Sequence, residues 1–211
     1  APLPPDYRKR SKDQLRQIQM IYQMADTALN PRMSVGQIIA RPVQFYLGLT
    51  GKAKRQRVDA LLNQIELDPA EYYNRLPSEL SGGQKQRIGI ARALAAEPRF
   101  IICDEVTSAL DQLVAEGILR LLARLQDELS LSYMFITHDL ATVRAIADEV
   151  VVMKDGYVVE QGPKAEMFSP PHHAYTDRLL SSVPEMDPDW LTNLLVERGV
   201  DNIGDAAVNE L

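Results

Sequence analysis

Cysteine is almost absent from this sequence, since Cys103 is the only one among 211 residues. A single thiol excludes an internal disulfide framework and leaves too few thiolates for an iron–sulfur cluster or a structural zinc site. This scarcity fits a reducing, cytosolic compartment. Hydrophobic residues still make up 45% of the chain, which is enough to fill the core of one large domain or two small ones.

Long apolar runs and an excess of positive charge are missing as well. The longest apolar stretches, such as FIIC at 100–103 and VVVM at 150–153, are far shorter than the ~20 residues that span a bilayer, and no signal-peptide pattern opens the chain. Lys and Arg total 23 against 29 Asp and Glu, which gives a net charge of −6. No general attraction to nucleic acid or anionic lipid is therefore expected, and any phosphate site must be local.

The first third of the chain predicts a linker, a strand and a helical region. Residues 1–14 are rich in proline and charge, which is typical of a linker or of the end of a removed part. The stretch LRQIQMIY at 15–22 alternates apolar and polar residues as a strand does, and Gln23 follows it. From residue 34 to about residue 73, apolar positions recur three and four apart around a break at two glycines, which predicts helices.

The stretch LSGGQKQR at 80–87 opens another predicted helix, which we expect to end at Glu97-Pro98. The N-terminus of a helix offers unpaired N–H groups to an anion. Gly82 and Gly83 would let a phosphate approach the backbone, and the Ser81 hydroxyl could cap the helix or donate to a phosphate oxygen. The alternative, a Ser-Gly-Gly loop that caps an ordinary helix, is the more common situation for those three residues alone.

Two apolar strands with polar residues at their ends follow. The strand at 100–103 is followed by Asp104 and Glu105, and the strand at 133–137 is followed by His138, with a helix at 113–129 between them. Such wholly apolar runs are typical of parallel strands that are covered on both faces. One carboxylate could hold Mg²⁺ and the other could orient and deprotonate a water. The alternatives are a solvated acidic turn and a structural histidine.

The remainder of the chain predicts a hairpin and a polar tail. The segment at 149–162 has an Asp-Gly turn between β-rich runs, and one further helix is expected at 189–199. His172 and His173 are more simply explained by a solvated tail than by a metal site.

The order of these motifs resembles that of an ATP-binding-cassette (ABC) ATPase from about residue 15 to residue 165. The resemblance implies an α/β fold, namely a partial P-loop NTPase of the ABC nucleotide-binding type, with a helical subdomain at about 30–98 and a C-terminal extension at 166–211. In that family two cassettes pair head to tail around two ATP molecules. The implied cofactors are ATP and Mg²⁺.

The resemblance also implies a role for each motif residue. The signature residues Ser81, Gly82, Gly83 and Gln84 would meet the ATP of the opposite subunit. Asp104 would hold Mg²⁺, Glu105 would be the general base and His138 the switch histidine. Gln23 would sense Mg²⁺ and couple to the transporter, and Asp111, the last residue of SALD at 108–111, would belong to the cross-dimer loop.

Three stretches resemble the oligopeptide and dipeptide importer branch, namely HHAYTDRLLSSVP, CDEVTSALD and ALNPRMSVG. The chain departs from the family pattern at Val106, where many cassettes carry proline, and after Gln23, where the usual Asp-Pro is missing. The branch implies a cytoplasmic-face, peripheral membrane location, with transmembrane permease subunits as partners. A solute-binding protein would act indirectly, and no nucleic acid is implied.

The string G-x-x-x-x-G-K-[ST], which cradles the phosphates of ATP, does not occur in these 211 residues. We therefore expect a cassette without its N-terminal part that hydrolyses little ATP alone. One alternative is a fragment that only contacts partners. Another is a soluble ABC ATPase of DNA repair or translation, although the long coiled-coil or basic insertions of those proteins do not appear here.

Overall fold

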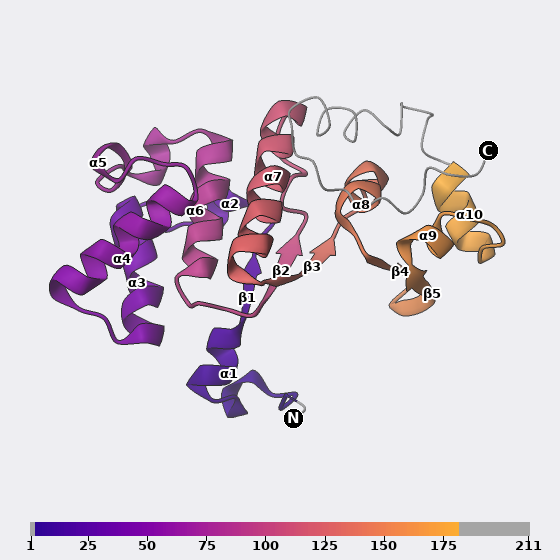
Figure 1. Cartoon of the computed structure of the whole chain (residues 1–211), viewed down its shortest axis with the longest axis horizontal. Helices are drawn as coiled ribbons and strands as arrows, with labels where there is room; N and C mark the ends of the chain where they lie inside the picture. The colour runs from indigo at the N-terminus through magenta and orange to yellow at the C-terminus, as the bar shows by residue number, and fades with distance from the viewer. Residues whose placement is uncertain (1–2, 182–211) are drawn as a thin grey trace. The chain divides into compact units, whose positions relative to one another are not determined.

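The computed structural model describes residues 3–181, apart from the side chains of residues 25 and 26. The described residues form two compact units that adjoin in sequence between Ile136 and Thr137. The first unit contains a three-stranded sheet with its helices, and the second contains a hairpin with three helices. Figure 1 shows the elements of each unit.

The sheet of the first unit is parallel, in the order β1-β2-β3. Its strands are β1 (Ile18–Ile21), β2 (Phe100–Asp104) and β3 (Ser132–Ile136). Ile21 lies beside Cys103, and Cys103 lies beside Phe135. Helix α7 (Gln112–Leu129) connects β2 to β3, so the βαβ unit predicted from the sequence is confirmed.

Helices fill the long connection between β1 and β2, as the sequence predicts. They are α2 (Ala25–Ala28), α3 (Val35–Leu47), α4 (Gly51–Gln64), α5 (Pro69–Tyr72), a 3-10 turn at Pro77–Glu79, and α6 (Gly82–Leu94). Gly48 and Gly51 have φ of 70° and 53° and separate α3 from α4, because a residue without Cβ tolerates this left-handed conformation. The break expected at two glycines is therefore confirmed.

The start of the first strand was predicted wrongly. Residues 12–17 form a helix, α1 (Lys12–Gln17), which follows a 3-10 turn at Tyr7–Lys9, so β1 begins at Ile18 rather than at Leu15. Ser11 caps α1 through a capping box with Gln14. This local signal outweighs the short alternation of apolar and polar residues.

One apolar core joins the sheet to the helices of the first unit. Ile101 and Cys103 of β2 are buried in a cluster that also contains Ile88 of α6 and Leu122 of α7. Helix α6 contacts β1, α7, and the helices α2, α3 and α4. The core therefore extends from the sheet into the helical insertion without interruption.

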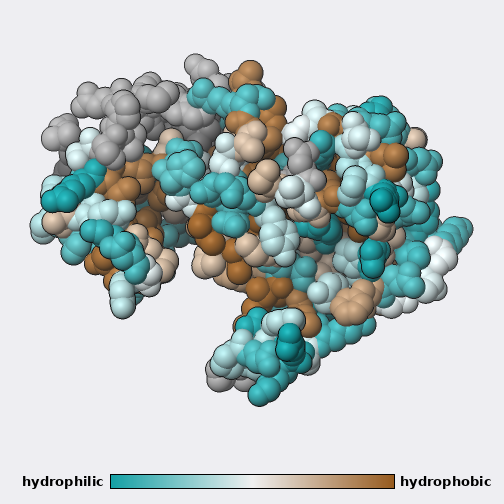
Figure 2. Space-filling view, turned by 180° about the vertical axis from the view of Figure 1, so that it is seen from behind, coloured by the Kyte–Doolittle hydropathy of each residue, from teal (hydrophilic) through white to brown (hydrophobic). Residues whose placement is uncertain are grey.

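The two faces of the sheet are covered to different extents, although the apolar strand sequences predicted that both faces would be covered. Ile101 and Cys103 of β2 are buried on one face, whereas Met134 and Ile136 of β3 are 42% and 45% exposed. Figure 2, the view from behind, shows hydrophobic side chains reaching the surface among hydrophilic ones. Within the described residues, the second face of the sheet is thus only partly covered.

Cys103 should be chemically inert in the folded protein. Burial raises the pKa of its thiol to about 12. At pH 8 we expect the folded chain to react with a thiol reagent on the order of 10²–10³-fold more slowly than the chain in denaturant, because the thiolate is the reactive species. The exposed Ala123→Cys variant supplies a fast-reacting control. Because the folded pKa is raised, the contribution of Cys103 to stability is complete below pH ~9 and is lost as the pH rises toward 12. Rapid native labelling would contradict the burial of this thiol.

The second unit contains the predicted hairpin. Strands β4 (Glu149–Lys154) and β5 (Tyr157–Pro163) pair antiparallel, and Asp155 and Gly156 in the turn between them have φ of 52° and 83°. This pair of positive φ values is typical of a two-residue hairpin turn with Asp-Gly. The hairpin prediction is therefore confirmed.

Three helices accompany the hairpin, namely α8 (Leu140–Ile146), α9 (Lys164–Met167) and α10 (Ala174–Ser181). The Glu160 carboxylate of β5 accepts a hydrogen bond of 3.0 Å from the backbone N–H of His173, just before α10. The helix predicted at 189–199 lies outside the described residues. Across residues 3–181, no helix combines the length and the apolarity that crossing a membrane requires.

Candidate functional site

The ends of the parallel strands bring Gln23 and Glu105 together. The pairing of Ile21 with Cys103 brings the residues that follow β1 and β2 to the same edge of the sheet. There the Gln23 side-chain amide donates a hydrogen bond of 2.5 Å to the Glu105 carboxylate oxygen Oε2. Ligands of open α/β sheets bind beyond the carboxyl ends of the strands, which is where this pair lies.

Asp104 and Glu105 leave the sheet in different ways. Asp104 is the last residue of β2 and is half-buried. Glu105 has a φ of 45°, which is uncommon for a residue with a Cβ, and its N–H donates to the Ile136 carbonyl at 2.8 Å. Uncommon backbone conformations of this kind gather at functional sites.

The donor set at this edge fits Mg²⁺. Two adjacent carboxylates and an amide side chain are hard oxygen donors, and Mg²⁺ is commonly held by one or two carboxylates together with waters and substrate phosphates. Within residues 3–181, no cluster of three or more His, Cys, Asp and Glu side chains forms a site that would hold a metal by protein ligands alone. A set of two carboxylates and one amide suits an ion whose remaining ligands are waters and phosphates.

The signature turn, which we define as Ser81–Gln84, is the first turn of α6. The Ser81 hydroxyl accepts a hydrogen bond from the Gln84 backbone N–H at 3.3 Å, and the Gln84 side chain accepts one from the Ser81 N–H at 2.9 Å. This reciprocal pair is a capping box, so the expected capping role of Ser81 is confirmed. The Gln84 amide also donates to the Tyr72 hydroxyl at 3.0 Å.

The two glycines of the signature turn have different surroundings. A Cβ placed on Gly83 would lie 2.5 Å from Cγ1 of Val114 in α7, whereas one on Gly82 would meet only Cδ2 of Leu110, at 3.5 Å. Gly83 thus permits close packing of two helices. Gly82 has the room for a Cβ, so the open approach to the backbone that the sequence suggested for both glycines applies to Gly82.

Asp111 lies next to the signature turn. It caps α7, since its side chain accepts a hydrogen bond from the Val114 N–H at 3.0 Å, and Val114 in turn packs against Gly83. The N-termini of α6 and α7 therefore adjoin. Both helices exceed twelve residues, and their N-termini carry partial positive charge that favours an anion.

A short loop connects Glu105 to Asp111. The Ser108 N–H and hydroxyl both donate to the Glu105 carbonyl, at 3.1 and 3.0 Å, and the Leu110 N–H donates to the Thr107 carbonyl at 3.1 Å. These bonds fold the loop into consecutive turns. The strand-end acids and the two helix N-termini are consequently joined by a structured segment.

His138 lies in the second unit, in the exposed segment between β3 and α8. The structure therefore gathers the predicted site residues of the first unit into two places. Gln23, Asp104 and Glu105 lie at the strand ends, and Ser81–Gln84 with Asp111 lie at the helix N-termini. The role predicted for His138 stays a prediction.

Arg92 of α6 is a residue that the sequence analysis missed. Its guanidinium donates to the Ala28 carbonyl and lies over the Tyr22 ring at 5.7 Å, and burial lowers its pKa. It thereby holds the segment on either side of Gln23 against the signature helix. The available signal was an arginine within the apolar stretch IGIARAL at 88–94, because such a group is rarely buried without a partner.

Comparison with known families matches most of the chain. Residues 4–108 match the family model described as ABC transporter, and residues 159–202 match the one described as oligopeptide/dipeptide transporter, C-terminal region. The chain belongs to the ABC transporter family. The resemblance drawn from Gln23, LSGGQ and the Asp-Glu pair is thereby confirmed, as is that of the tail to the peptide-importer branch.

Relatives of this ABC protein carry peptide-transport names. The chain is 46% identical over 187 residues to the oligopeptide transport ATP-binding protein OppF of Bacillus subtilis, covering 88% of this chain and 61% of that one. It is 48% identical over 181 residues to OppF of Escherichia coli, covering 85% and 54%. It is 44% identical over 174 residues to the dipeptide transport ATP-binding protein DppF of Haemophilus influenzae, covering 82% and 53%. The chain thus spans about half to three-fifths of these relatives.

Solved structures confirm the ABC-type α/β fold. The chain resembles cbiO1 of Clostridium perfringens, part of the transporter complex cbiONQ, with a TM-score of 0.65 and 33% identity over 72% of this chain and 59% of that one. It also resembles the dimeric, post-hydrolysis structure of the cassette MJ0796 with ADP and Pi, with a TM-score of 0.59 and 33% identity, covering 70% and 64%.

Proposed function

We propose that this chain is part of the ATP-binding subunit of an ABC transporter that imports peptides, and that Glu105 is the general base for ATP hydrolysis by that subunit. The observation that carries the proposal is the hydrogen bond from Gln23 to Glu105 at the carboxyl ends of β1 and β2. An amide that holds one carboxylate oxygen fixes the orientation of the carboxylate, and a general base must be positioned in this way.

Asp104 and Gln23 would hold Mg²⁺ at this edge of the sheet, by their oxygen atoms. When bound, ATP would supply the electrophilic phosphorus and Mg²⁺ would neutralise the charge of its phosphates. The chain's own residues position the nucleophile: Glu105 accepts the proton of the attacking water, and Gln23 holds Glu105 in place. His138, which follows β3, is proposed to contact the γ-phosphate.

The signature turn is proposed to serve a second ATP, which is held by another cassette paired head to tail with this one. Its N–H groups and those at the start of α7 offer an anion site. The first turns of both helices contain no acid, and Asp111 stands just before α7 as its N-cap. The relative MJ0796 is a dimer in the presence of ADP and Pi, which supports the pairing.

The proposed partners are a second cassette, permease subunits in the membrane and, indirectly, a solute-binding protein. Under this proposal the protein acts at the cytoplasmic face of the membrane, bound to the permease. The support comes from the OppF and DppF relatives and from the match of residues 159–202 to the peptide-transporter tail. No nucleic acid is proposed as a partner.

The test is ATP-driven peptide uptake by proteoliposomes that contain a peptide permease and the whole ATP-binding subunit of which this chain is part, with ATP enclosed and a loaded solute-binding protein outside. We expect uptake with ATP and none with ADP or without this protein. The 211-residue chain assayed alone should hydrolyse little ATP, because it contains no G-x-x-x-x-G-K-[ST] string. A rate of ATP hydrolysis that is the same with and without the loaded binding protein would contradict a role in import.

A further inference from the structure

The ends of α4 and α6 carry the same uncommon feature. Glu66 follows α4 and Glu97 follows α6, and their φ angles are 60° and 52°. Glycine is the usual residue in this left-handed conformation at the end of a helix, because a Cβ is strained there. Strain of this kind persists only where surrounding contacts hold it, so we expect both glutamates to be held by specific contacts.

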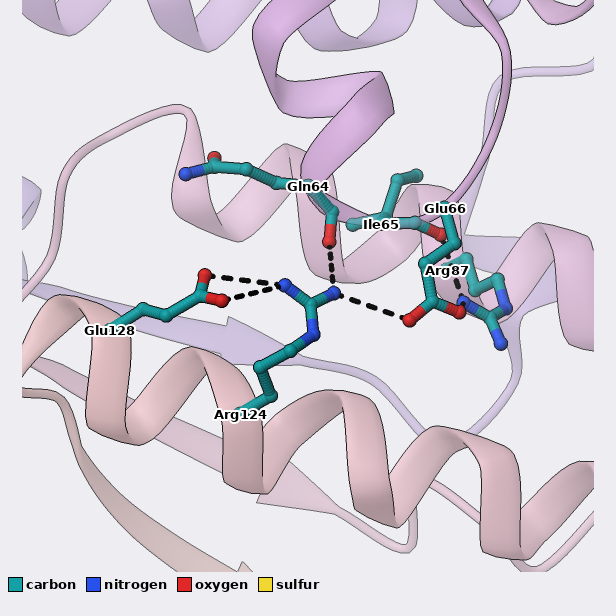
Figure 3. Close-up of polar contacts among 6 residues, drawn as sticks. All are labelled: Gln64, Ile65, Glu66, Arg87, Arg124 and Glu128. Atoms are coloured by element: carbon teal, nitrogen blue, oxygen red, sulfur yellow. Dashed lines mark hydrogen bonds and ion pairs between the residues drawn. The ribbon is translucent and has the colours of Figure 1, made fainter.

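Glu66 bridges two arginines from two other helices (Figure 3). Arg87 of α6 donates to Oε2 of Glu66 at 2.6 Å, and Arg124 of α7 lies 3.3 Å from Oε1. Arg124 also pairs with Glu128 on its own helix at 3.0 Å. One carboxylate thus connects the end of α4 to both helices whose N-termini form the proposed anion site.

The same arginines satisfy the backbone at the end of α4. Arg87 donates to the Ile65 carbonyl at 2.9 Å, and Arg124 donates to the Gln64 carbonyl at 2.7 Å. The last carbonyls of a helix lack partners within the helix and carry partial negative charge, so guanidinium groups are well placed there. The contact is therefore made to the helix end as well as to Glu66.

Glu97 repeats the arrangement in the opposite direction. Its carboxylate lies 3.4 Å from Arg57 of α4 and 3.6 Å from Arg16 of α1. Glu66, just beyond the end of α4, thus binds an arginine of α6, and Glu97, just beyond the end of α6, binds an arginine of α4. The exchange is reciprocal.

We propose that Glu66 and Glu97 form a reciprocal clamp between α4 and α6, which positions the signature turn for the ATP of the partner cassette. The two glutamates are positioning residues, since neither lies in the signature turn itself. This inference rests on the proposed function for its role in ATP hydrolysis, whereas the clamp itself is a property of this chain alone.

The clamp is expected to favour one orientation of α4 against α6 without making it rigid. Glu66 and Glu97 are 54% and 49% exposed, while Arg87 and Arg57 are 21% and 27% exposed. Ion pairs with one partner in solvent are weak and are screened by salt. The orientation of α4 against α6 is therefore expected to loosen at high ionic strength.

The first test measures that orientation in the chain alone. Spin labels are attached to Ala60→Cys in α4 and to Ala123→Cys in α7, which packs against α6. Pulsed electron paramagnetic resonance then measures the distance between the two labels. Both sites are exposed, and the buried Cys103 stays unlabelled. We expect a narrow distribution at low salt that widens at least twofold in 1 M NaCl. The variant Glu66→Gly/Glu97→Gly should be wide at both salt concentrations. Glycine suits the backbone at both positions, so the fold should survive, and Glu66→Gln/Glu97→Gln serves if it does not.

Glu128→Gln is the matched control, because it removes an exposed partner of Arg124 that lies on the same helix. It should leave the distribution narrow. A double glycine variant with a distribution as narrow as that of the unchanged chain would overturn the clamp. A double glycine variant whose distance distribution widens with salt as much as that of the unchanged chain would also overturn the clamp.

The second test is turnover in the proteoliposomes described above. The double glycine variant should lower kcat about 3- to 10-fold, while the Glu128→Gln control should not. A widened distance distribution with unchanged turnover would overturn the positioning role, provided that Glu105→Gln abolishes turnover in the same preparation. If Glu105→Gln has no effect, the proposed function fails, and the clamp is then judged by the distances alone.

Discussion

Replacing Glu105 by glutamine is expected to lower ATP turnover by about 10²–10⁴-fold in the reconstituted transporter, the usual contribution of a positioned general base. Glutamine keeps the size of the side chain and can still pair with Gln23, which now contacts Glu105 at 2.5 Å. The glutamine introduced at position 105 cannot accept a proton from water. The loss should therefore fall on kcat, and the affinity for ATP should change little.

The measurement is steady-state ATP hydrolysis at saturating peptide, together with nucleotide binding by calorimetry on the same preparation. Glu128→Gln is a suitable control, because Glu128 is an exposed acid of α7 that pairs with Arg124. A Glu105→Gln protein that turns over at the unchanged rate would assign the base to another group. A protein that no longer binds ATP would instead make Glu105 a binding residue.

Replacing Gly83 by alanine is expected to destabilise the protein by about 1–3 kcal/mol, the usual range for an added group in a packed interior. The new Cβ would lie 2.5 Å from Cγ1 of Val114, and the β-branched valine has little rotamer freedom in a helix. Helices α6 and α7 would have to separate. Because their N-termini adjoin at this contact, the proposed anion site should weaken along with the fold.

Urea unfolding followed by circular dichroism measures this effect, and the chain offers a matched control. Gly89 lies in the same helix, and a Cβ there would meet no atom outside the helix within 4 Å. Gly89→Ala should therefore gain roughly 0.5–1 kcal/mol from helix propensity. Adding Val114→Ala to Gly83→Ala should recover part of the loss. Equal effects of the two glycine substitutions would refute the packing explanation.

The sequence predicted those parts of the fold that local patterns govern. The helix cap by Ser81 and the Asp155-Gly156 turn each depend on residues within three positions, so their chemistry is visible in the sequence. The helix at the start of the chain was missed although the same kind of signal, Ser11 with Gln14, was present. There the apolar alternation beginning at Leu15 was given too much weight.

The parts that could not be predicted depend on contacts between distant residues. Nothing near Gly83 announces that Val114, 31 positions later, packs against it. Glu66 and Arg87 likewise resemble ordinary charges on solvated helix faces until the fold places them together. Charges alone did not suggest the left-handed conformation of Glu66, because glycine is the residue that usually marks it.

The short loop from Glu105 to Asp111 has a consequence for communication between the two ATP sites of a head-to-tail pair. Glu105 would serve one nucleotide, and Asp111 would lie at the other. Six peptide bonds separate them, a contour length of at most about 20 Å. The loop is folded into turns by Ser108 and Leu110, which shortens it further. Loss of phosphate at one site would thus be sensed at the other through a single covalent segment, and the two hydrolysis events would be statistically dependent even without the membrane subunits.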